Sequence, residues 1–150
     1  MIIDFSKIAI ISIDIGTPDK IKDYNNDIDD VFINFLNLKY KEYKSKGAHL
    51  ININYLGETN NLLTVNFDLV TTEYGKLVHY VTANSIDTIV YTGYHFPICT
   101  HNGRQLSGEY LQEDTENFPS VYVCPFLCRP LPELSGNIPT DTSRLRTIML

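Results

Sequence analysis

Cys99 and Asp14 are the two residues whose types and positions point to chemistry. A cysteine thiolate is a strong nucleophile, and a neighbouring carboxylate can move protons to and from the reacting groups. Asp14 ends an apolar run that begins at Lys7, and Cys99 follows a second apolar run, 86–93, by six residues. If the two runs are neighbouring strands, the thiol and the carboxylate face each other. Such a pair suits acyl transfer, in which the thiolate attacks a carbonyl carbon.

The surroundings of Cys99 favour the same chemistry. We expect residues 94–98 to form a loop and a helix to open at Cys99 and run to about Gln112. Backbone N–H groups at the start of a helix stabilise an anion, which lowers the pKa of a thiol there. The same N–H groups can hold the oxyanion of a tetrahedral intermediate.

Alternating strands and helices must position these residues. Five strands are predicted, at 7–14, 48–55, 62–66, 86–93 and 120–124. Helices are predicted from about 28 to 46, from 72 to 84 and after Cys99, with a further short helix over 143–150. This order predicts one three-layer αβα domain over residues 1–150, with a mostly parallel, doubly wound sheet. Ligands of such sheets bind beyond the carboxyl ends of the strands, at the point where the strand order reverses.

Composition excludes several classes of partner. The chain has 150 residues, with 12 basic and 18 acidic side chains and a formal charge of −6, which argues against nucleic acid as a partner. The lysine-rich stretch 39–46 is the basic end of a helix that begins at Asp27, Asp29 and Asp30 and stops at Gly47. No run is long enough to span a membrane, and the amino terminus lacks a secretory pattern, so we expect a cytoplasmic protein with free thiols. Cys124 and Cys128 could supply only one pair of zinc ligands, and no second pair accompanies them, so we do not expect a zinc site.

Three segments of the chain resemble the isochorismatase-like cysteine hydrolases, which include nicotinamidases and N-carbamoyl amidohydrolases. Residues 10–14 resemble the first strand of the family, which ends in its catalytic Asp, and residues 48–55 resemble the second. The segment from Ser85 through Gly93, then five residues, then Cys99, resembles the nucleophile segment. The resemblance implies that Cys99 is the nucleophile and Asp14 its base. It also implies a homo-oligomer and a cis peptide before the Cys, where this chain has Phe96-Pro97.

The chain departs from the family pattern at two positions. The family has a catalytic Lys at the end of its third strand, and here that position falls near Asn66. Lys76 lies on the following predicted helix and is not assigned. The nicotinamidase branch binds a metal through an Asp-x-His motif after the second strand, whereas this chain has Leu56-Gly-Glu-Thr. We therefore expect no metal and no other cofactor.

Two hypotheses follow for the function. The first is a hydrolase of a small amide-type or related substrate, with Cys99 and Asp14 as catalytic residues. The second is a catalytically impaired relative that binds a ligand or a partner. Residues expected to support the site are Asn66, His95, Phe96, Pro97 and Ile98, and those expected to bind substrate are Tyr55, Glu58 and Tyr94.

A rival interpretation concerns the turn 13–17, Ile-Asp-Ile-Gly-Thr. It resembles the first phosphate loop of actin-like and sugar kinases, and more faintly the nucleophile loop of haloacid-dehalogenase-like phosphatases. The kinase fold needs a longer chain, and in the phosphatase loop Ser12 stands where the nucleophilic Asp belongs. Neither explains the segment from Gly93 to Cys99, so both rank below the cysteine hydrolase.

Overall fold

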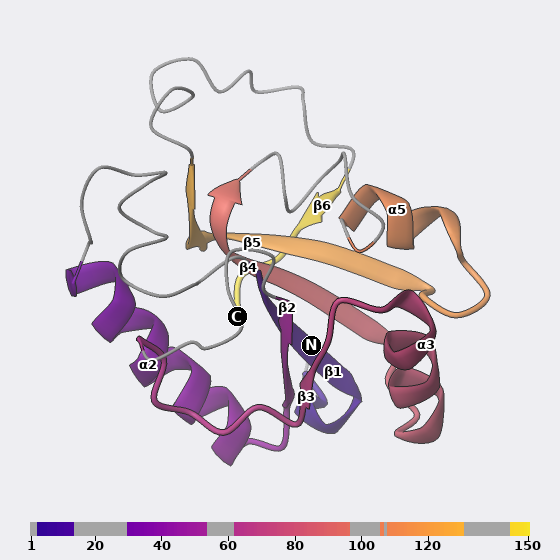
Figure 1. The fold of residues 1–150 in the computed structure, drawn as a ribbon, viewed down its shortest axis with the longest axis horizontal. Helices are drawn as coiled ribbons and strands as arrows, with labels where there is room; N and C mark the ends of the chain where they lie inside the picture. The colour runs from indigo at the N-terminus through magenta and orange to yellow at the C-terminus, as the bar shows by residue number, and fades with distance from the viewer. Residues whose placement is uncertain (1–2, 14–29, 54–61, 97–105, 107, 131–144) are drawn as a thin grey trace.

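The computed structural model describes residues 3–13, 30–53, 62–96, 106, 108–130 and 145–150, with the backbone alone at 94–96, 109 and 129–130. A six-stranded sheet dominates this part of the chain, and all of its strand pairs are parallel. The strand order is β3-β2-β1-β4-β5-β6 (Figure 1). This is the doubly wound order, in which the direction of winding reverses between β1 and β4. The predicted fold class is confirmed.

The strands and helices have the following bounds. The strands are β1 (Ile8–Ile13), β2 (His49–Ile53), β3 (Leu69–Val70), β4 (Thr88–Phe96), β5 (Ser120–Pro130) and β6 (Arg146–Thr147). The helices are α2 (Asp30–Ser45), α3 (Tyr74–Ala83) and α5 (Gly108–Glu113), and a short 3-10 turn, Phe5–Lys7, precedes β1.

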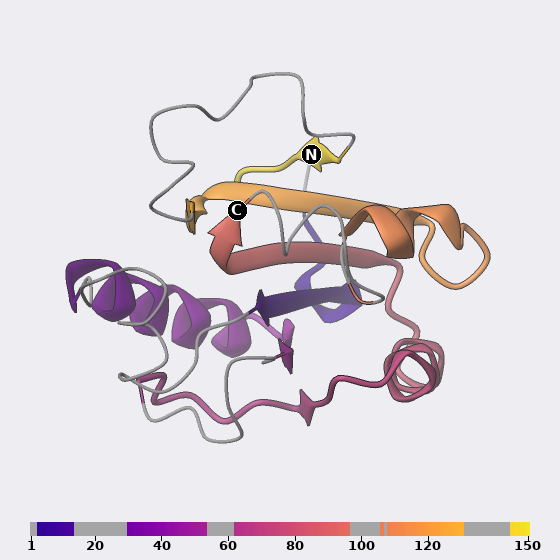
Figure 2. The same ribbon diagram turned by 45° about the horizontal axis from the view of Figure 1, so that its top comes forward.

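The two faces of the sheet are covered by different helices (Figures 1 and 2). On one face, Phe32, Leu36 and Tyr43 of α2 join a buried core with alternate residues of β1, β2 and β4. On the other face, Leu77 of α3 and Leu111 of α5 join a second core with the intervening strand residues. All six residues of β1 are buried, because helices cover the central strand from both sides.

Several predicted elements hold and others are wrong. The strands at 7–14 and 48–55 and the helix over 28–46 are confirmed within the described ranges, as is the helix from 72 to 84. The third strand is Leu69–Val70, not 62–66, and residues 145–150 contain the short strand β6 in place of a helix. β4 extends to Phe96, so the backbone of residues 94–96 is strand rather than loop. Leu106 lies in a turn and α5 begins at Gly108, so one continuous helix from 99 to 112 is wrong.

β5 departs from a regular ladder beside the end of β4. Tyr91 pairs with Val123 and Gly93 pairs with Cys128, so β5 contains extra residues between these two pairs. Pro125 lies in this bulge, where it does not have to donate a ladder hydrogen bond. A second shift follows between Gly93 and Phe96. Such bulges redirect a strand and are common next to functional sites.

Gly93 is required by the close approach of β1 and β4. Its φ is +112°, and a Cβ at this position would lie 2.3 Å from the carbonyl oxygen of Ile13. Any side chain would therefore meet the backbone of β1, which cannot move aside within the sheet. Gly93 permits the last residue of β1 to lie directly beside β4.

We predict that Gly93→Ala lowers the free energy of unfolding by about 3 kcal/mol or more, because it adds both a strained φ and a backbone clash. Urea unfolding followed by circular dichroism measures the change. Gly75→Ala is the matched control, because Gly75 lies in α3 and a Cβ there meets nothing within 4 Å. The control is expected to be neutral or to stabilise by up to about 1 kcal/mol. Equal stability of the two variants would contradict the packing argument.

Candidate functional site

The carboxyl ends of β1 and β2 lie at the level of Gly93 in β4, which continues for three more residues to Phe96. Ile13 pairs with Ile53 on one side and with Gly93 on the other. The order of the strands reverses between β1 and β4, and ligands of doubly wound sheets bind in the crevice at that point. The candidate site is therefore the region beyond these three strand ends.

Most of the predicted site residues follow these strands in the sequence. Asp14 directly follows Ile13, and Cys99 comes six residues after Gly93. Tyr55 and Glu58 follow β2. The residues predicted for the site that lie outside the described ranges are Asp14, Tyr55, Glu58, Pro97, Ile98 and Cys99. For Tyr94, His95 and Phe96 the structure describes only the backbone, which continues β4.

Asn66 does not lie at the predicted end of the third strand. It precedes β3 by three residues, and its backbone carbonyl accepts a hydrogen bond from Lys44 Nζ near the end of α2. Asp68, two residues later, is bound to the backbone of Leu50, near the start of β2. Asn66 therefore lies towards the amino edge of the parallel sheet, opposite to the site. The prediction failed because the third strand begins later than the apolar stretch 62–65 suggests.

No lysine occupies the carboxyl end of β3. The residues there are Leu69, Val70, Thr71, Thr72 and Glu73. Thr71 is buried, its N–H donates to the carbonyl of Asn52, and its hydroxyl accepts a hydrogen bond from the N–H of Glu73. Lys76 lies on α3 and is exposed, with Nζ 2.7 Å from a carboxylate oxygen of Glu73.

A row of buried polar side chains lies one residue below the strand ends. Ser12 of β1 pairs with Asn52 of β2 on one side and with Thr92 of β4 on the other. All three are at most 4% exposed. Asn52 Oδ1 is buried and has no hydrogen-bond partner among the described residues. Such buried polar atoms without a partner are rare, and the described residues contain two others, Ser12 Oγ in the same row and the hydroxyl of Tyr43 in the core.

Tyr40 of α2 reaches this row through a directed chain of hydrogen bonds. Thr92 Oγ1 donates to the carbonyl of Ile11 at 2.8 Å and lies 2.6 Å from the hydroxyl of Tyr40. A threonine hydroxyl has one proton, so Tyr40 must be the donor to Thr92. Burial raises the pKa of Tyr40, so its hydroxyl stays protonated and the direction of the chain is fixed. These contacts hold α2 and β4 against β1 next to Gly93.

The sequence analysis missed Tyr40, Ser12, Thr92 and Asn52. A signal was present, because each of the three strand residues interrupts an apolar strand one residue before a paired position, namely Ile13, Ile53 or Gly93. Only the pairing of the strands shows that these three residues lie side by side.

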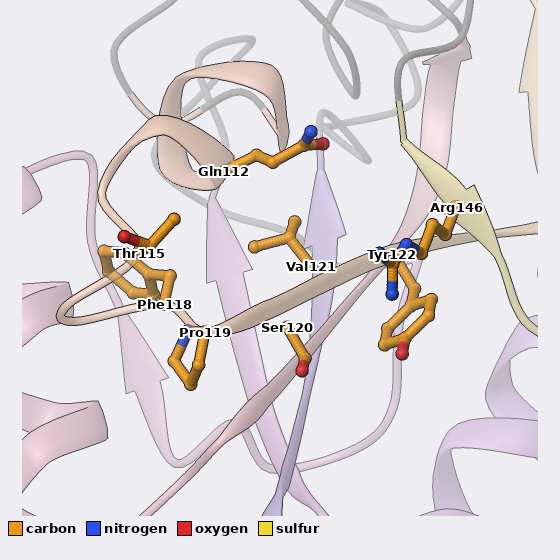
Figure 3. A pocket seen from close by; sticks show the side chains of 8 residues that line it. All are labelled: Gln112, Thr115, Phe118, Pro119, Ser120, Val121, Tyr122 and Arg146. Atoms are coloured by element: carbon orange, nitrogen blue, oxygen red, sulfur yellow. The ribbon is translucent and has the colours of Figure 1, made fainter.

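A separate pocket of about 250 Å³ lies elsewhere on the sheet. Its lining includes Gln112, Phe118, Ser120 and Arg146, whose side chains point in different directions (Figure 3). Ser120 is paired with Thr88, the first residue of β4, so this pocket lies at the amino edge of the sheet. It is therefore at the opposite end from the three strand ends.

The two described cysteines are structural. Cys124 and Cys128 are buried at the bulge of β5, and they belong to the cores on opposite faces of the sheet. Cys128 Sγ donates to the carbonyl of Cys124 at 3.3 Å. Burial raises the pKa of Cys124, which makes it a poor nucleophile. Among the described residues, no group of three His, Cys, Asp or Glu side chains could hold a metal ion.

Comparison with known proteins identifies the fold. A solved structure of an isochorismatase family protein from Burkholderia thailandensis superposes with a TM-score of 0.60 over 95% of this chain and 92% of that chain. The sequence identity is 14%. No family model matches the sequence, and no curated protein matches it either. The chain has an isochorismatase-like α/β fold, as the sequence resemblance implied. No helix in the described ranges is long and apolar enough to cross a membrane.

We predict that Thr92→Val lowers the free energy of unfolding by about 1–3 kcal/mol, because it removes the hydroxyl that pairs with the buried hydroxyl of Tyr40. Thr92→Ser keeps the hydroxyl and is the matched control. Tyr40→Phe in the Thr92→Val background should cost less than Tyr40→Phe alone, with a coupling of about 1 kcal/mol in a double-mutant cycle. Strict additivity of the two substitutions would show that the hydrogen bond contributes nothing.

Proposed function

We propose that the protein is a hydrolase of a small amide-type or related substrate, with Cys99 as nucleophile and Asp14 as proton carrier. One observation supports this more than any other. Ile13, which directly precedes Asp14, is paired with Gly93, which begins the segment that leads to Cys99. The carboxylate-bearing segment thus leaves β1 beside Gly93, and the thiol-bearing segment follows the adjacent strand β4, which continues three residues further to Phe96, at the switch point of the sheet.

The proposed reaction has two stages. Asp14 takes the proton of the Cys99 thiol, the resulting thiolate attacks the carbonyl carbon of the substrate, and backbone N–H groups beside Cys99 stabilise the oxyanion. The carbon–nitrogen bond then breaks as Asp14 gives a proton to the leaving amine, which leaves a thioester on Cys99. In the second stage Asp14 takes a proton from water, the resulting hydroxide attacks the thioester, and the acid and the free thiol are released.

The buried polar row supports a site for a polar ligand above the strand ends. Asn52 offers a buried carbonyl oxygen that no described residue uses. Such an acceptor suits an N–H group, and amides carry N–H donors. Ser12 and Thr92 make the strand face below the site polar, whereas the next residues inward, Ile10 and Val90, are apolar core. We infer that the polar row forms the floor of the site.

The second candidate function is ligand or partner binding without catalysis. It is favoured by the lack of a basic residue from Leu69 to Glu73, at the end of β3, where the family resemblance leads us to expect a lysine. A lysine there would stabilise a thiolate by opposite charge. Without that cation, catalysis would depend on backbone N–H groups to lower the pKa of Cys99.

The pH dependence of Cys99 alkylation distinguishes the two functions. An unperturbed thiol has a pKa of about 8.5, and a primed Cys99 should react with iodoacetamide with a midpoint at least about one pH unit lower. Peptide mass spectrometry separates Cys99 from Cys124, which serves as an internal reference because burial raises its pKa. A Cys99 midpoint at or above about 8.5 would contradict the hydrolase and favour the binding function.

Asp14→Asn tests the partnership with the carboxylate. If the two groups are in contact, the substitution should shift the midpoint of Cys99 alkylation, because interacting groups titrate together. It should also lower hydrolysis of any amide found in a substrate screen by about 10²–10⁴-fold, the usual contribution of a general acid–base group. Asp87→Asn is a matched control, because Asp87 lies at the amino edge of the sheet just before β4. An unchanged alkylation profile in Asp14→Asn would show that the two groups do not touch.

A further inference from the structure

The pocket at the amino edge of the sheet is formed by three segments that are separate in the sequence. α5 contributes Gln112, and the turn that follows it contributes Thr115 and Phe118. The start of β5 forms the middle of the pocket, and Arg146 of β6 lies at the end away from Thr115 (Figure 3). The volume is about 250 Å³. A cavity of roughly 150 Å³ can hold benzene, so this pocket has room for one ring with a small polar substituent.

Arg146 gives this pocket its charge, since it is the one charged side chain among the eight residues that line it. Its side chain is exposed and makes no ion pair with a residue of the described ranges. The chain has 18 acidic and 12 basic side chains, yet no acidic residue lines the pocket beside Arg146. A guanidinium group binds a carboxylate through two parallel hydrogen bonds, so the pocket favours an anion of that shape.

Neutral polar groups accompany the guanidinium. Gln112 carries an amide, and Thr115 and Ser120 carry hydroxyls. None of these three side chains forms a hydrogen bond with another described residue. Amide N–H and hydroxyl groups donate hydrogen bonds, so they add donors for an anion that Arg146 attracts.

A buried aromatic ring provides an apolar wall that is already fixed in place. Phe118 is 2% exposed, and its ring packs edge to face against Tyr74 of α3 with the centroids 5.9 Å apart. The N–H of Phe118 donates to the carbonyl of Asp114 at 2.9 Å, and the Asp114 carboxylate accepts hydrogen bonds from Tyr74 and Asn117. Buried Val121 adds a second apolar side chain to the lining. A wall held in this way loses little entropy when a ligand binds.

We propose that this pocket binds a small organic carboxylate, with the carboxylate group at Arg146 and an apolar ring against Phe118 and Val121. The lining favours this ligand over two other classes. Nucleic acid and other polyanions require clustered cations, whereas the pocket has one. A wholly apolar ligand would cover the guanidinium without pairing it, which is costly. An amphipathic monoanion satisfies both the charged end and the apolar wall.

The proposed ligand site is separate from the candidate site of hydrolysis. Ser120 pairs with Thr88, the first residue of β4, whereas the candidate site lies beyond Gly93 of the same strand. The proposal therefore stands whether or not Cys99 is a nucleophile. A carboxylate is also a product of amide hydrolysis and could bind at the candidate site, so the test must show that binding depends on Arg146.

Benzoate is the probe, because it combines one carboxylate with one ring. Isothermal titration calorimetry should give a dissociation constant in the millimolar range, as expected for a ligand of so few atoms. Arg146→Gln should raise that constant by about tenfold or more. Arg146→Lys should have a smaller effect, because it keeps the charge but loses the two parallel hydrogen bonds. Acetate, which lacks the ring, and benzyl alcohol, which lacks the charge, should each bind about tenfold more weakly than benzoate.

Lys41→Gln is the matched control, because Lys41 is also exposed and has no ion-pair partner in the described part of the chain, but it lies on α2. It should leave benzoate binding unchanged. Thermal unfolding of each variant establishes that it is folded. A lack of saturable benzoate binding in the millimolar range, or binding that Arg146→Gln leaves unchanged, would overturn the proposal. Equal affinities for benzoate and acetate would overturn the placement of a ring against Phe118.

Discussion

The backbone contact between Ile13 and Gly93 is the constraint on which the candidate site depends. Two parallel strands normally lie about 4.8 Å apart, and a side chain at each position leaves the sheet on one face or the other. At Gly93 the positive φ turns the missing Cβ towards the backbone of β1. Only glycine meets this requirement without strain. The bulge of β5 on the other side of β4 accompanies this change of direction, so three strands adjust around one residue.

Polar contacts hold the same region on the face of the sheet that α2 covers. A buried hydroxyl chain from Tyr40 through Thr92 to Ile11 joins α2, β4 and β1. Each such bond contributes only about 1 kcal/mol, but breaking one leaves a buried donor or acceptor unpaired at a larger cost. Apolar side chains at these positions would pack against α2 without needing hydrogen-bond partners. The polar row therefore fixes the position of α2 relative to β1 and β4, at the level of the sheet where the chain turns towards the site.

The sequence predicts the central part of this fold well because its signals are local and strong. Unbroken apolar runs give β1 and β4, and apolar spacing with an acidic start, a basic end and Gly47 gives α2. The edges are harder because β3 and β6 are two residues long, and such short strands are defined by their neighbours rather than by their own composition. Asn66 was misplaced for that reason. The coincidence of Ser12, Asn52 and Thr92 depends on register, which no single segment specifies.

The ends of β1, β2 and β3 carry no charged side chain, whereas β5 ends in Arg129 and Pro130 next to the end of β4. Ile13, Ile53, Thr71 and Gly93 are neutral, and Lys76 is engaged on α3. A thiolate near the ends of β1 and β4 would draw its stabilisation from backbone N–H groups or from a cationic side chain that another segment contributes. The fold alone therefore does not specify the reaction. The sheet fixes where two segments emerge, and the chemistry depends on what those segments place at the switch point.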